Sequence, residues 1–120
     1  MDATQSRQRF RRCLEGETVG YPISVFDPIS ARIAEHLGAH LGILGGSIAS
    51  ASTLAAPDVM VLTLSELADR VCRITHAADI SLLVDADHGY GNSLNVMRVI
   101  RDLESAGASA ISIEDTELPT

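Results

Sequence analysis

The feature that most constrains the fold is a regular alternation between short apolar runs and amphipathic helical segments. Four runs are predicted to be strands: Tyr21–Phe26, Leu41–Leu44, Ser81–Asp87 and Ala110–Asp115. Their apolar residues are nearly continuous, which is typical of strands that are buried on both faces. Such strands, separated by helices, form a parallel sheet covered by helices. The sequence therefore predicts an α/β fold with one parallel sheet.

Helix boundary signals support this alternation. A first amphipathic helix is predicted over Gln5–Glu15, before the first strand. Asp27 and Pro28 suit the N-cap and the first position of a second helix. Apolar residues recur along that helix at intervals of four, and glycine follows them: Ile29, Ile33, Leu37 and then Gly38.

Two more helices are expected in the second half of the chain. A capping box at Thr63–Glu66 begins one of them, with an apolar stripe along Leu64, Leu67, Val71, Ile74 and Ala78. The other is expected to turn Val96, Ile100 and Leu103 inward and to stop at Gly107. The small residues after the second strand are predicted to form a loop up to about Leu62. The order α-βα-βα-βα-β lacks a linker, so residues 1–120 are expected to form one unit.

Composition excludes several functions. The chain carries 16 acidic and 9 basic residues, a net charge of −7, which argues against a nucleic-acid partner. Every basic residue is an arginine, so no Schiff-base or Walker-type lysine is present. The longest uncharged run, Leu41–Pro57, falls short of the about 20 apolar residues of a membrane span.

The cysteines and the N-terminus indicate a compartment. Cys13 and Cys72 have no metal-ligand spacing, and no apolar signal segment opens the chain. We therefore expect free thiols and a cytoplasmic protein. Cys72 is interpreted as a packing residue that faces neither an acid nor a histidine.

Acidic residues gather where the predicted strands end, which is where parallel α/β folds bind ligands. Asp85 and Asp87 are two positions apart, a spacing that would place both side chains on one strand face, and Glu114 ends the next strand. Three converging carboxylates would repel one another unless a cation lay among them. Oxygen ligands favour Mg²⁺ or Mn²⁺. Solvated loop acids are the alternative, and Asp27 is better explained as a helix cap.

Two other polar residues near the strand ends allow two interpretations each. Ser47 follows two glycines and either binds a ligand or begins a turn. His88 either supports the acids or is an exposed loop histidine.

Four ordered blocks resemble the isocitrate lyase/phosphoenolpyruvate mutase superfamily, and in particular its oxaloacetate decarboxylase branch: Ser24–Arg32, Gly42–Ser47, Asp85–Asn92 and Ile113–Thr116. His88 stands where lyases and mutases of the superfamily usually have threonine or another small residue, which favours the decarboxylase branch. The resemblance implies a (β/α)₈ TIM-type barrel of roughly 250–300 residues. This chain is expected to be its N-terminal portion, with one helix before the strands.

The resemblance also implies roles for single residues. Asp85 matches the direct magnesium ligand, while Asp87 and Glu114 match acids that hold the ion, often through its water molecules. Ser47, with the Gly46 backbone, matches the position that hydrogen-bonds the substrate carboxylate. The substrate-binding arginine and histidine and the gating loop of the family lie beyond the matched blocks.

The implied activity is the Mg²⁺-dependent decarboxylation of oxaloacetate to pyruvate and CO₂, with Mn²⁺ as a possible substitute for Mg²⁺. The cation stabilises the enolate that forms as CO₂ leaves, and Ser47 orients the retained carboxylate. Asp58 matches, more loosely, an acid near the substrate. The expected partners are a small 2-oxo acid and further copies of the chain, in a tetramer by family resemblance.

Three alternatives stay open. One is a carbon–carbon lyase of the same superfamily, such as a 2-methylisocitrate lyase. Another is a phosphoacceptor receiver domain, which would need an acidic pair after the first strand and a lysine, where this chain has Val25-Phe26-Asp27 and no lysine. The third is a non-catalytic fragment. Four strands cannot close an eight-stranded barrel, so the chain alone is expected to be inactive, with apolar surface that promotes association.

Overall fold

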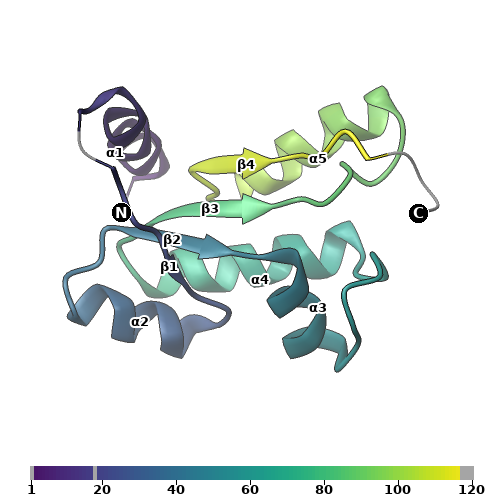
Figure 1. The fold of residues 1–120 in the computed structure, drawn as a ribbon, viewed down its shortest axis with the longest axis horizontal. Coiled ribbons are helices and arrows are strands. Elements are labelled where there is room, and N and C mark those ends of the chain that lie inside the picture. Colours follow the sequence, from purple (N-terminus) through teal and green to yellow (C-terminus); the bar gives the residue numbers. More distant parts are fainter. Residues whose placement is uncertain (1, 18, 117–120) are drawn as a thin grey trace.

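The computed structural model describes residues 2–17 and 19–116, and their strands form one parallel sheet (Figure 1). The strands are β1 (Ile23–Ser24), β2 (Leu41–Leu44), β3 (Ser81–Asp85) and β4 (Ala110–Ser112). They lie side by side in chain order, β1-β2-β3-β4, and every neighbouring pair is parallel. At the centre of the sheet, Leu41 lies opposite Ser81 and Leu44 opposite Val84. The predicted α/β fold with a parallel sheet is confirmed.

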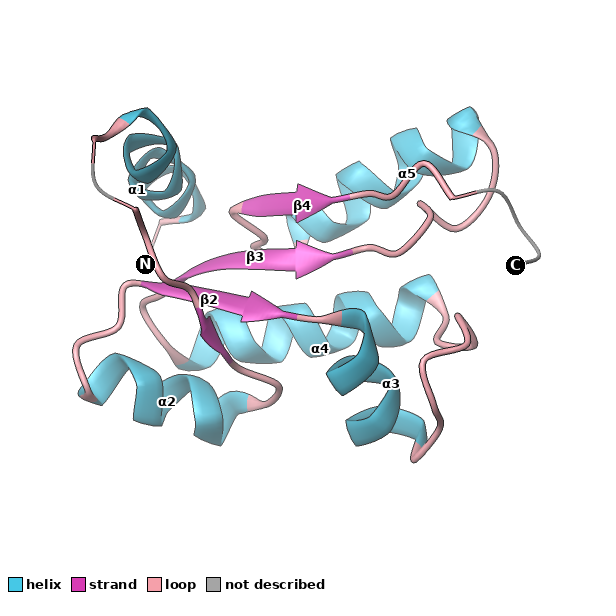
Figure 2. Cartoon of the chain, viewed as in Figure 1, coloured by secondary structure: helices cyan, strands magenta, loops and turns pink. Residues whose placement is uncertain are grey.

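Helices connect consecutive strands, as Figure 2 shows. They are α2 (Pro28–His36), α3 (Gly46–Leu54), α4 (Leu64–Ala77) and α5 (Ser93–Ser105), while α1 (Ala3–Glu15) precedes β1. The strands run from left to right in Figure 1, with α1 at the end where they begin and α3 at the end where β2 finishes. None of the helices formed by the described residues is both long and apolar enough to cross a bilayer.

Side-chain caps fix where the helices begin. Asp27 accepts a hydrogen bond from the Ser30 N–H at 2.7 Å and donates its own N–H to the Ser30 hydroxyl at 3.0 Å. This confirms Asp27 as the cap of α2, and Thr63 and Glu66 form the predicted capping box of α4. Helix α1 begins two residues before its predicted start, because the Asp2 carboxylate accepts the Thr4 N–H.

The segment that the sequence predicts as a loop up to Leu62 contains α3, so that prediction is wrong. Gly45 is the N-cap, and Ala55, with a φ of 50°, ends the helix in a left-handed turn. The helix consists mainly of glycine, alanine and serine, and it buries Gly46, Ala49 and Ser50. Small residues pack closely without an apolar stripe, so periodicity gives no signal for this helix.

Three strands are shorter than predicted. Just beyond β1 and β4, the backbone still bonds to the neighbouring segment. Val25 N–H donates to Ile43 O at 3.0 Å, and Glu114 N–H donates to Asp87 O at 2.7 Å. Strand β1 is confined between Pro22, which has no N–H, and the helix cap at Asp27. Strand β3 ends at Asp85 because the backbone turns at Asp87, where φ is 46°.

The core lies between the sheet and its helices. Leu82, Val84 and Leu44 are fully buried in the sheet, and α4 covers them with the predicted residues Leu67, Val71 and Ile74. Helix α5 buries Val99 and Leu103, whereas Ile100, predicted to point inward, is 43% exposed. The prediction is confirmed for Leu103 and wrong for Ile100, because apolar residues surround α5 so widely that spacing alone does not distinguish Val99 from Ile100.

Helix α2 packs on the core through its small residues. Ala31 and Ala34 are buried, while its long apolar residues Ile29, Ile33 and Leu37 are 70%, 55% and 76% exposed. The apolar spacing therefore predicts the helix correctly, but most of the apolar area lies on the face that this chain leaves open.

Three serines close the end of the sheet where the strands begin. The Ser81 hydroxyl donates to Ser6 O at 2.9 Å, and the Leu82 N–H donates to the Ser109 hydroxyl at 3.2 Å. The hydroxyls of Ser6 and Ser109 also bond to each other. These bonds fasten α1 across the beginning of β3 and β4, and they satisfy the buried polar groups there.

Candidate functional site

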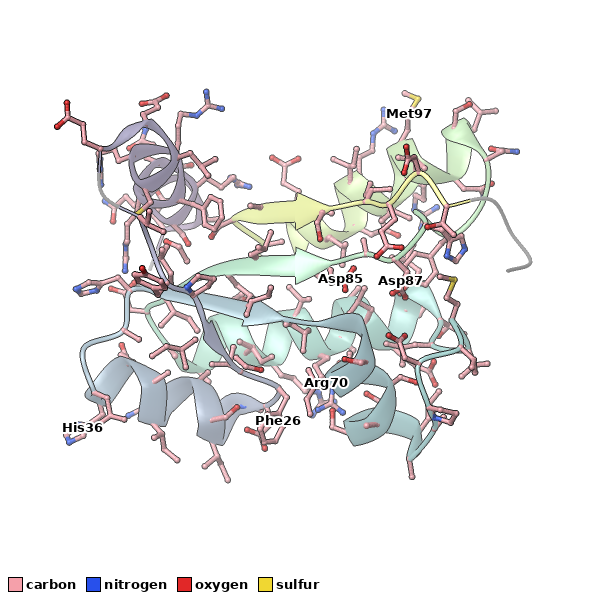
Figure 3. All side chains as sticks on the ribbon, in the orientation of Figure 1. Phe26, His36, Arg70, Asp85, Asp87 and Met97 are labelled. Atoms are coloured by element: carbon pink, nitrogen blue, oxygen red, sulfur yellow. The ribbon has the colours of Figure 1, made fainter. Side chains whose placement is uncertain are left out.

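Asp85 and Asp87 lie together at the end where the strands finish (Figure 3). Asp85 is the last residue of β3, and its Oδ1 accepts the Asp87 N–H at 3.1 Å. Asp87 has a left-handed backbone with a φ of 46°. The turn at Asp87, and not the alternation of a strand, therefore brings the two residues together, which corrects the reason for expecting them on one face.

The beginning of α3 forms the other wall of this site. The Gly46 N–H donates to Asp85 Oδ2 at 3.1 Å. A Cβ at position 46 would lie 2.5 Å from Asp87 Oδ1 and 3.3 Å from Asp85 Oδ2. Only glycine allows both carboxylates to approach the backbone this closely, so the arrangement of the site requires glycine at position 46.

Ser47 lies in the first turn of α3 and is exposed to solvent. The N–H groups of a first helical turn have no partner within the helix and favour an anion. The Ser47 hydroxyl and these N–H groups lie next to the acidic pair, in a position to bind a carboxylate. The role that the resemblance implies for Ser47 and Gly46 stays a prediction.

Three other carboxylates act on Asp87 at this rim of the sheet. Asp87 is 9% exposed, and its pKa is raised above the usual value, first by burial and then by the charges of Asp85, Asp58 and Glu114, while His88 opposes the shift. The structure thus places Asp58, whose family match is looser, within electrostatic reach of the pair. Such a concentration of negative charge is costly without a cation.

Glu114 takes a more peripheral position than Asp85 and Asp87. Its N–H donates to Asp87 O at 2.7 Å, but its side chain is exposed and accepts a hydrogen bond from the Thr116 hydroxyl at 2.9 Å. Within residues 2–17 and 19–116, no three His, Cys, Asp or Glu side chains are gathered in a ready metal-binding arrangement. The structure brings Asp85, Asp87 and Gly46 into contact and leaves Glu114 beside them.

The loop after β3 carries unusual backbone strain. Asp87 and Tyr90 have positive φ angles of 46° and 61°, next to Gly89 at 82° and Gly91 at 143°. A Cβ at Gly89 would lie 2.5 Å from a methyl group of Val96, so this glycine is also required by packing. Strain of this kind persists where a site must hold an exact arrangement of groups.

Tyr90 and His88 belong to this loop, and each has a buried polar atom. Tyr90 Oη and His88 Nδ1 have no hydrogen-bond partner among the described residues, and their rings are 5.6 Å apart. His88 is half-buried, which corrects the interpretation of an exposed loop histidine. Burial and the charges of Asp87 and Asp85 raise the pKa of Tyr90, so its hydroxyl stays protonated. The glycines on both sides of Tyr90 are the sequence signal for this strained turn.

Arg70 of α4 lies near Phe26 and the last turn of α3, as Figure 3 shows. Its guanidinium donates to Phe26 O at 2.7 Å, to Ser52 O at 3.2 Å and to the Thr53 hydroxyl at 2.8 Å. One side chain thereby fixes α3 against the loop after β1. Sequence analysis missed this role, because the partners are distant in the chain and two of them are backbone carbonyls.

Cys72 packs against the core, as the sequence predicts, but the prediction that it faces no histidine is wrong. Its Sγ lies 3.5 Å from His76 Nδ1, which is also 2.7 Å from Cys72 O one helical turn away. Cys13 and Cys72 are both free thiols, as expected. The Cys72–His76 contact is local to α4 and does not include the acidic residues.

Comparison with known proteins identifies this arrangement. The family model of phosphoenolpyruvate phosphomutase matches residues 10–119. The oxaloacetate decarboxylase of Paraburkholderia xenovorans (strain LB400) is 53% identical over 116 residues, which are 97% of this chain and 39% of that protein. Oxaloacetate decarboxylase 1 of Pseudomonas fluorescens (strain Pf0-1) is 55% identical over 113 residues, with 94% and 39% covered. The chain thus spans about 39% of the length of these curated relatives.

Solved structures agree with this assignment. A crystal structure of phosphonopyruvate hydrolase has a TM-score of 0.90 and 33% identity, and covers 96% of this chain and 41% of its own. Phosphonopyruvate hydrolase in complex with oxalate and Mg²⁺ has a TM-score of 0.85 and 32% identity, with 96% and 40% covered. These neighbours are TIM-barrel enzymes, which confirms the predicted fold class. The chain belongs to the phosphoenolpyruvate phosphomutase family, within the isocitrate lyase/phosphoenolpyruvate mutase superfamily.

Proposed function

We propose that this chain forms the metal- and carboxylate-binding wall of a decarboxylase that converts oxaloacetate to pyruvate and CO₂. One observation carries the proposal: Asp85 and Asp87 are packed against the Gly46 backbone, where α3 begins. Carboxylates and free N–H groups lie there side by side, as a cation and an organic anion together require. The relatives named oxaloacetate decarboxylase support the choice of substrate.

The residues present fit Mg²⁺. The donors are carboxylate oxygens, and hard divalent cations take oxygen ligands. The raised pKa of Asp87 reports negative charge that a cation would neutralise. Asp85 and Asp87 would hold the ion, with Glu114 reaching it through water. A divalent cation there would stabilise, as a Lewis acid, the negative charge that develops on the 2-oxo oxygen.

The other residues orient the substrate. The Ser47 hydroxyl and the N–H groups of the first turn of α3 would bind the carboxylate that pyruvate retains. The Gly46 N–H donates to Asp85 Oδ2, so it holds that carboxylate in place. Binding one end of the substrate leaves the distal carboxylate free to depart as CO₂, after which a proton adds to the adjacent carbon.

The test uses the protein at the full length of its relatives. Asp85→Ala is expected to lower metal-dependent turnover of oxaloacetate at least about a hundredfold, because it removes a direct ligand. Isothermal titration of Mg²⁺ gives a readout independent of turnover and should show the same loss of affinity. Asp69→Ala is the matched control, since Asp69 is an exposed acid that pairs with Arg73 on α4.

Two results would contradict the proposal. Near-normal turnover by Asp85→Ala would remove the metal site from the mechanism. Faster cleavage of 2-methylisocitrate than of oxaloacetate by the unaltered protein would favour the carbon–carbon lyase that the sequence leaves open.

A further inference from the structure

Helix α3 has little that fixes its own position. It is nine residues long, and isolated helices shorter than about 12–15 residues are marginal in water. Its N-cap, Gly45, makes no side-chain hydrogen bond, and neither an acidic residue in its first turn nor a basic residue in its last turn complements the helix dipole. The residues that it buries, Gly46, Ala49 and Ser50, are small. The position of α3 must therefore be set by groups outside the helix.

Arg70 of α4 provides such a group at the last turn of α3. Its Nη1 donates to Phe26 O at 2.7 Å, while its Nη2 donates to Ser52 O at 3.2 Å and to the Thr53 hydroxyl at 2.8 Å. Ser52 and Thr53 belong to α3, so the guanidinium places a positive charge at the negative end of the helix dipole. Because Phe26 lies just after β1, one side chain joins α4, α3 and the loop after β1.

Two hydroxyls of α3 itself bond only within the helix or just beyond it. The Ser52 hydroxyl donates to Ile48 O at 2.6 Å, and the hydroxyl of the buried Ser50 donates to Pro57 O at 3.1 Å. These bonds support the helix and the segment that follows it, but they do not join α3 to another helix or strand. Arg70 makes such a connection, so its bonds set the direction of α3.

The opposite end of α3 reaches the acidic pair. The Gly46 N–H donates to Asp85 Oδ2 at 3.1 Å, and a Cβ at position 46 would lie 2.5 Å from Asp87 Oδ1. A helix of nine residues is about 13 Å long, so a rotation at the last turn of α3 moves its first turn by the largest distance. A misplacement of about 1 Å can lower the activity of a site about a hundredfold. The bonds of Arg70 at one end of α3 therefore govern where Ser47 lies at the other end.

We propose that Arg70 is a positioning residue for the substrate carboxylate: its bonds to the last turn of α3 aim the Ser47 hydroxyl and the first-turn N–H groups at that carboxylate. The inference deepens the proposed function and rests on it. Asp85 and Asp87 are held by β3 and the turn after it, where the Asp87 N–H donates to Asp85 Oδ1. The loss of Arg70 should therefore weaken binding of the carboxylate more than binding of Mg²⁺.

Isothermal titration with oxalate tests the proposal on the protein at the full length of its relatives, at saturating Mg²⁺. Oxalate can chelate a cation and present a carboxylate to α3, but it has no group that can leave. Arg70→Met should raise the Kd for oxalate at least about tenfold, whereas the Kd for Mg²⁺ alone should change by less than about threefold. Arg73→Met is the matched control and should change neither Kd, since Arg73 lies on the same helix, is 67% exposed and pairs with Asp69.

Thr53→Val provides a second variant, because it removes one acceptor of Arg70 and keeps the shape of the side chain. It should raise the Kd for oxalate about threefold in the otherwise unaltered protein and have no further effect in Arg70→Met, where the bond is already lost. Additive effects of the two substitutions would overturn the proposal, because Arg70 would then not act through α3. If Arg70→Met does not fold, the oxalate affinity of Thr53→Val decides, and an unchanged affinity overturns the proposal.

Turnover separates this proposal from the proposed function. The carboxylate that pyruvate retains is charged in both the ground state and the transition state, so Arg70→Met should raise the KM for oxaloacetate and leave kcat nearly unchanged. If the unaltered protein binds oxalate but does not convert oxaloacetate, the proposed decarboxylation fails while the oxalate titrations still decide the role of Arg70. Absence of oxalate binding by the unaltered protein, equal oxalate affinity in Arg70→Met, or equal losses of oxalate and Mg²⁺ affinity would each overturn the role of Arg70.

Discussion

The two ends of the sheet differ in how their polar groups are satisfied. Where the strands begin, the hydroxyls of Ser6, Ser81 and Ser109 bond to one another and to backbone groups. Where the strands finish, Tyr90 Oη and His88 Nδ1 are buried without a partner among the described residues. The first end contributes to stability, whereas the second holds groups in positions that cost stability.

Charge and backbone strain follow the same division. Asp87 is nearly buried, close to three other carboxylates, and lies in a loop with four positive φ angles. Groups held in this way lower the free energy of unfolding and are retained where they serve a site. This contrast predicts that substitutions lower the free energy of unfolding where the strands begin. Where the strands finish, substitutions should leave that free energy unchanged or raise it. Each prediction below concerns the free energy of unfolding in urea at one protein concentration.

The largest expected effect is at Gly107, where the strands begin. Its φ is 100°, and an added Cβ would lie 2.6 Å from Thr75 Oγ1 and 3.0 Å from Thr75 Cβ. Thr75 cannot move aside easily, since its hydroxyl donates to Ala106 O at 2.7 Å. Gly107→Ala should lower the free energy of unfolding by about 2–4 kcal/mol.

Gly38→Ala measures the cost of backbone strain without a clash of the added Cβ. Gly38 has a φ of 87°, but an added Cβ would meet nothing within 4 Å. It should therefore cost only the strain, about 1–2 kcal/mol. Equal costs at Gly38 and Gly107 would show that the contact with Thr75 is irrelevant.

Ser6→Ala should cost about 1–2 kcal/mol, because it removes a buried hydroxyl and leaves the half-buried hydroxyl of Ser109 without one of its bonds. Ser65→Ala is the control, since Ser65 is exposed on α4 and should change stability by less than about 0.5 kcal/mol. If both variants were equally stable, the serine cluster would not contribute to the division between the two ends.

At the other end, Asp87→Asn should raise the free energy of unfolding by about 1 kcal/mol at pH 7 without added divalent cation. The substitution removes a nearly buried charge that burial and neighbouring carboxylates destabilise. Asp69→Asn, which breaks an exposed ion pair with Arg73, should have no such stabilising effect. A loss of stability in Asp87→Asn would place Asp87 among the structural residues.

The stability gained in Asp87→Asn should also depend on pH. The pKa of Asp87 is raised in the folded chain, so the folded state binds this proton more readily than the unfolded state does. Stability from this group is complete below the unfolded pKa, near 3.8, and is lost as pH rises through the folded pKa. The advantage of Asp87→Asn should therefore vanish in acid below that value. An advantage that is independent of pH would have a cause other than charge.

The smallest effect on unfolding is expected for Gly46→Ala. The added Cβ would contact Asp87 Oδ1, the end of a side chain that can rotate away, so stability should change by less than about 1 kcal/mol. The displaced carboxylate should nevertheless weaken Mg²⁺ binding, measured by titration of the full-length protein. Unchanged Mg²⁺ affinity would separate Gly46 from the site.

Much of the fold could be predicted because strong local signals coincide with it. The capping boxes at Asp27 and Thr63 and the apolar stripe of α4 are encoded within a few residues. Helix α3 lacks such a signal, since its residues are small on every side. The exposed apolar face of α2 shows a further limit, because spacing identifies a helix but not which of its faces meets the core.

The candidate site was harder to predict for a geometric reason. Sequence spacing identifies Asp85 and Asp87, but their contact arises from the left-handed turn at Asp87, which spacing does not specify. The approach of Gly46, 39 positions earlier, depends on the pairing of β2 with β3. Arg70 acts through backbone carbonyls, and any sequence can provide these.

The order of the strands in the sheet is the order in which a ribosome makes them. Each newly synthesised strand from β2 to β4 finds the previous strand as its neighbour, so no segment has to wait for a distant one. Domains fold during synthesis from the N-terminal side when early segments already contain their contacts. A pause in synthesis after α4 would leave β2 without its neighbour β3, and an unpaired strand edge of this kind promotes aggregation.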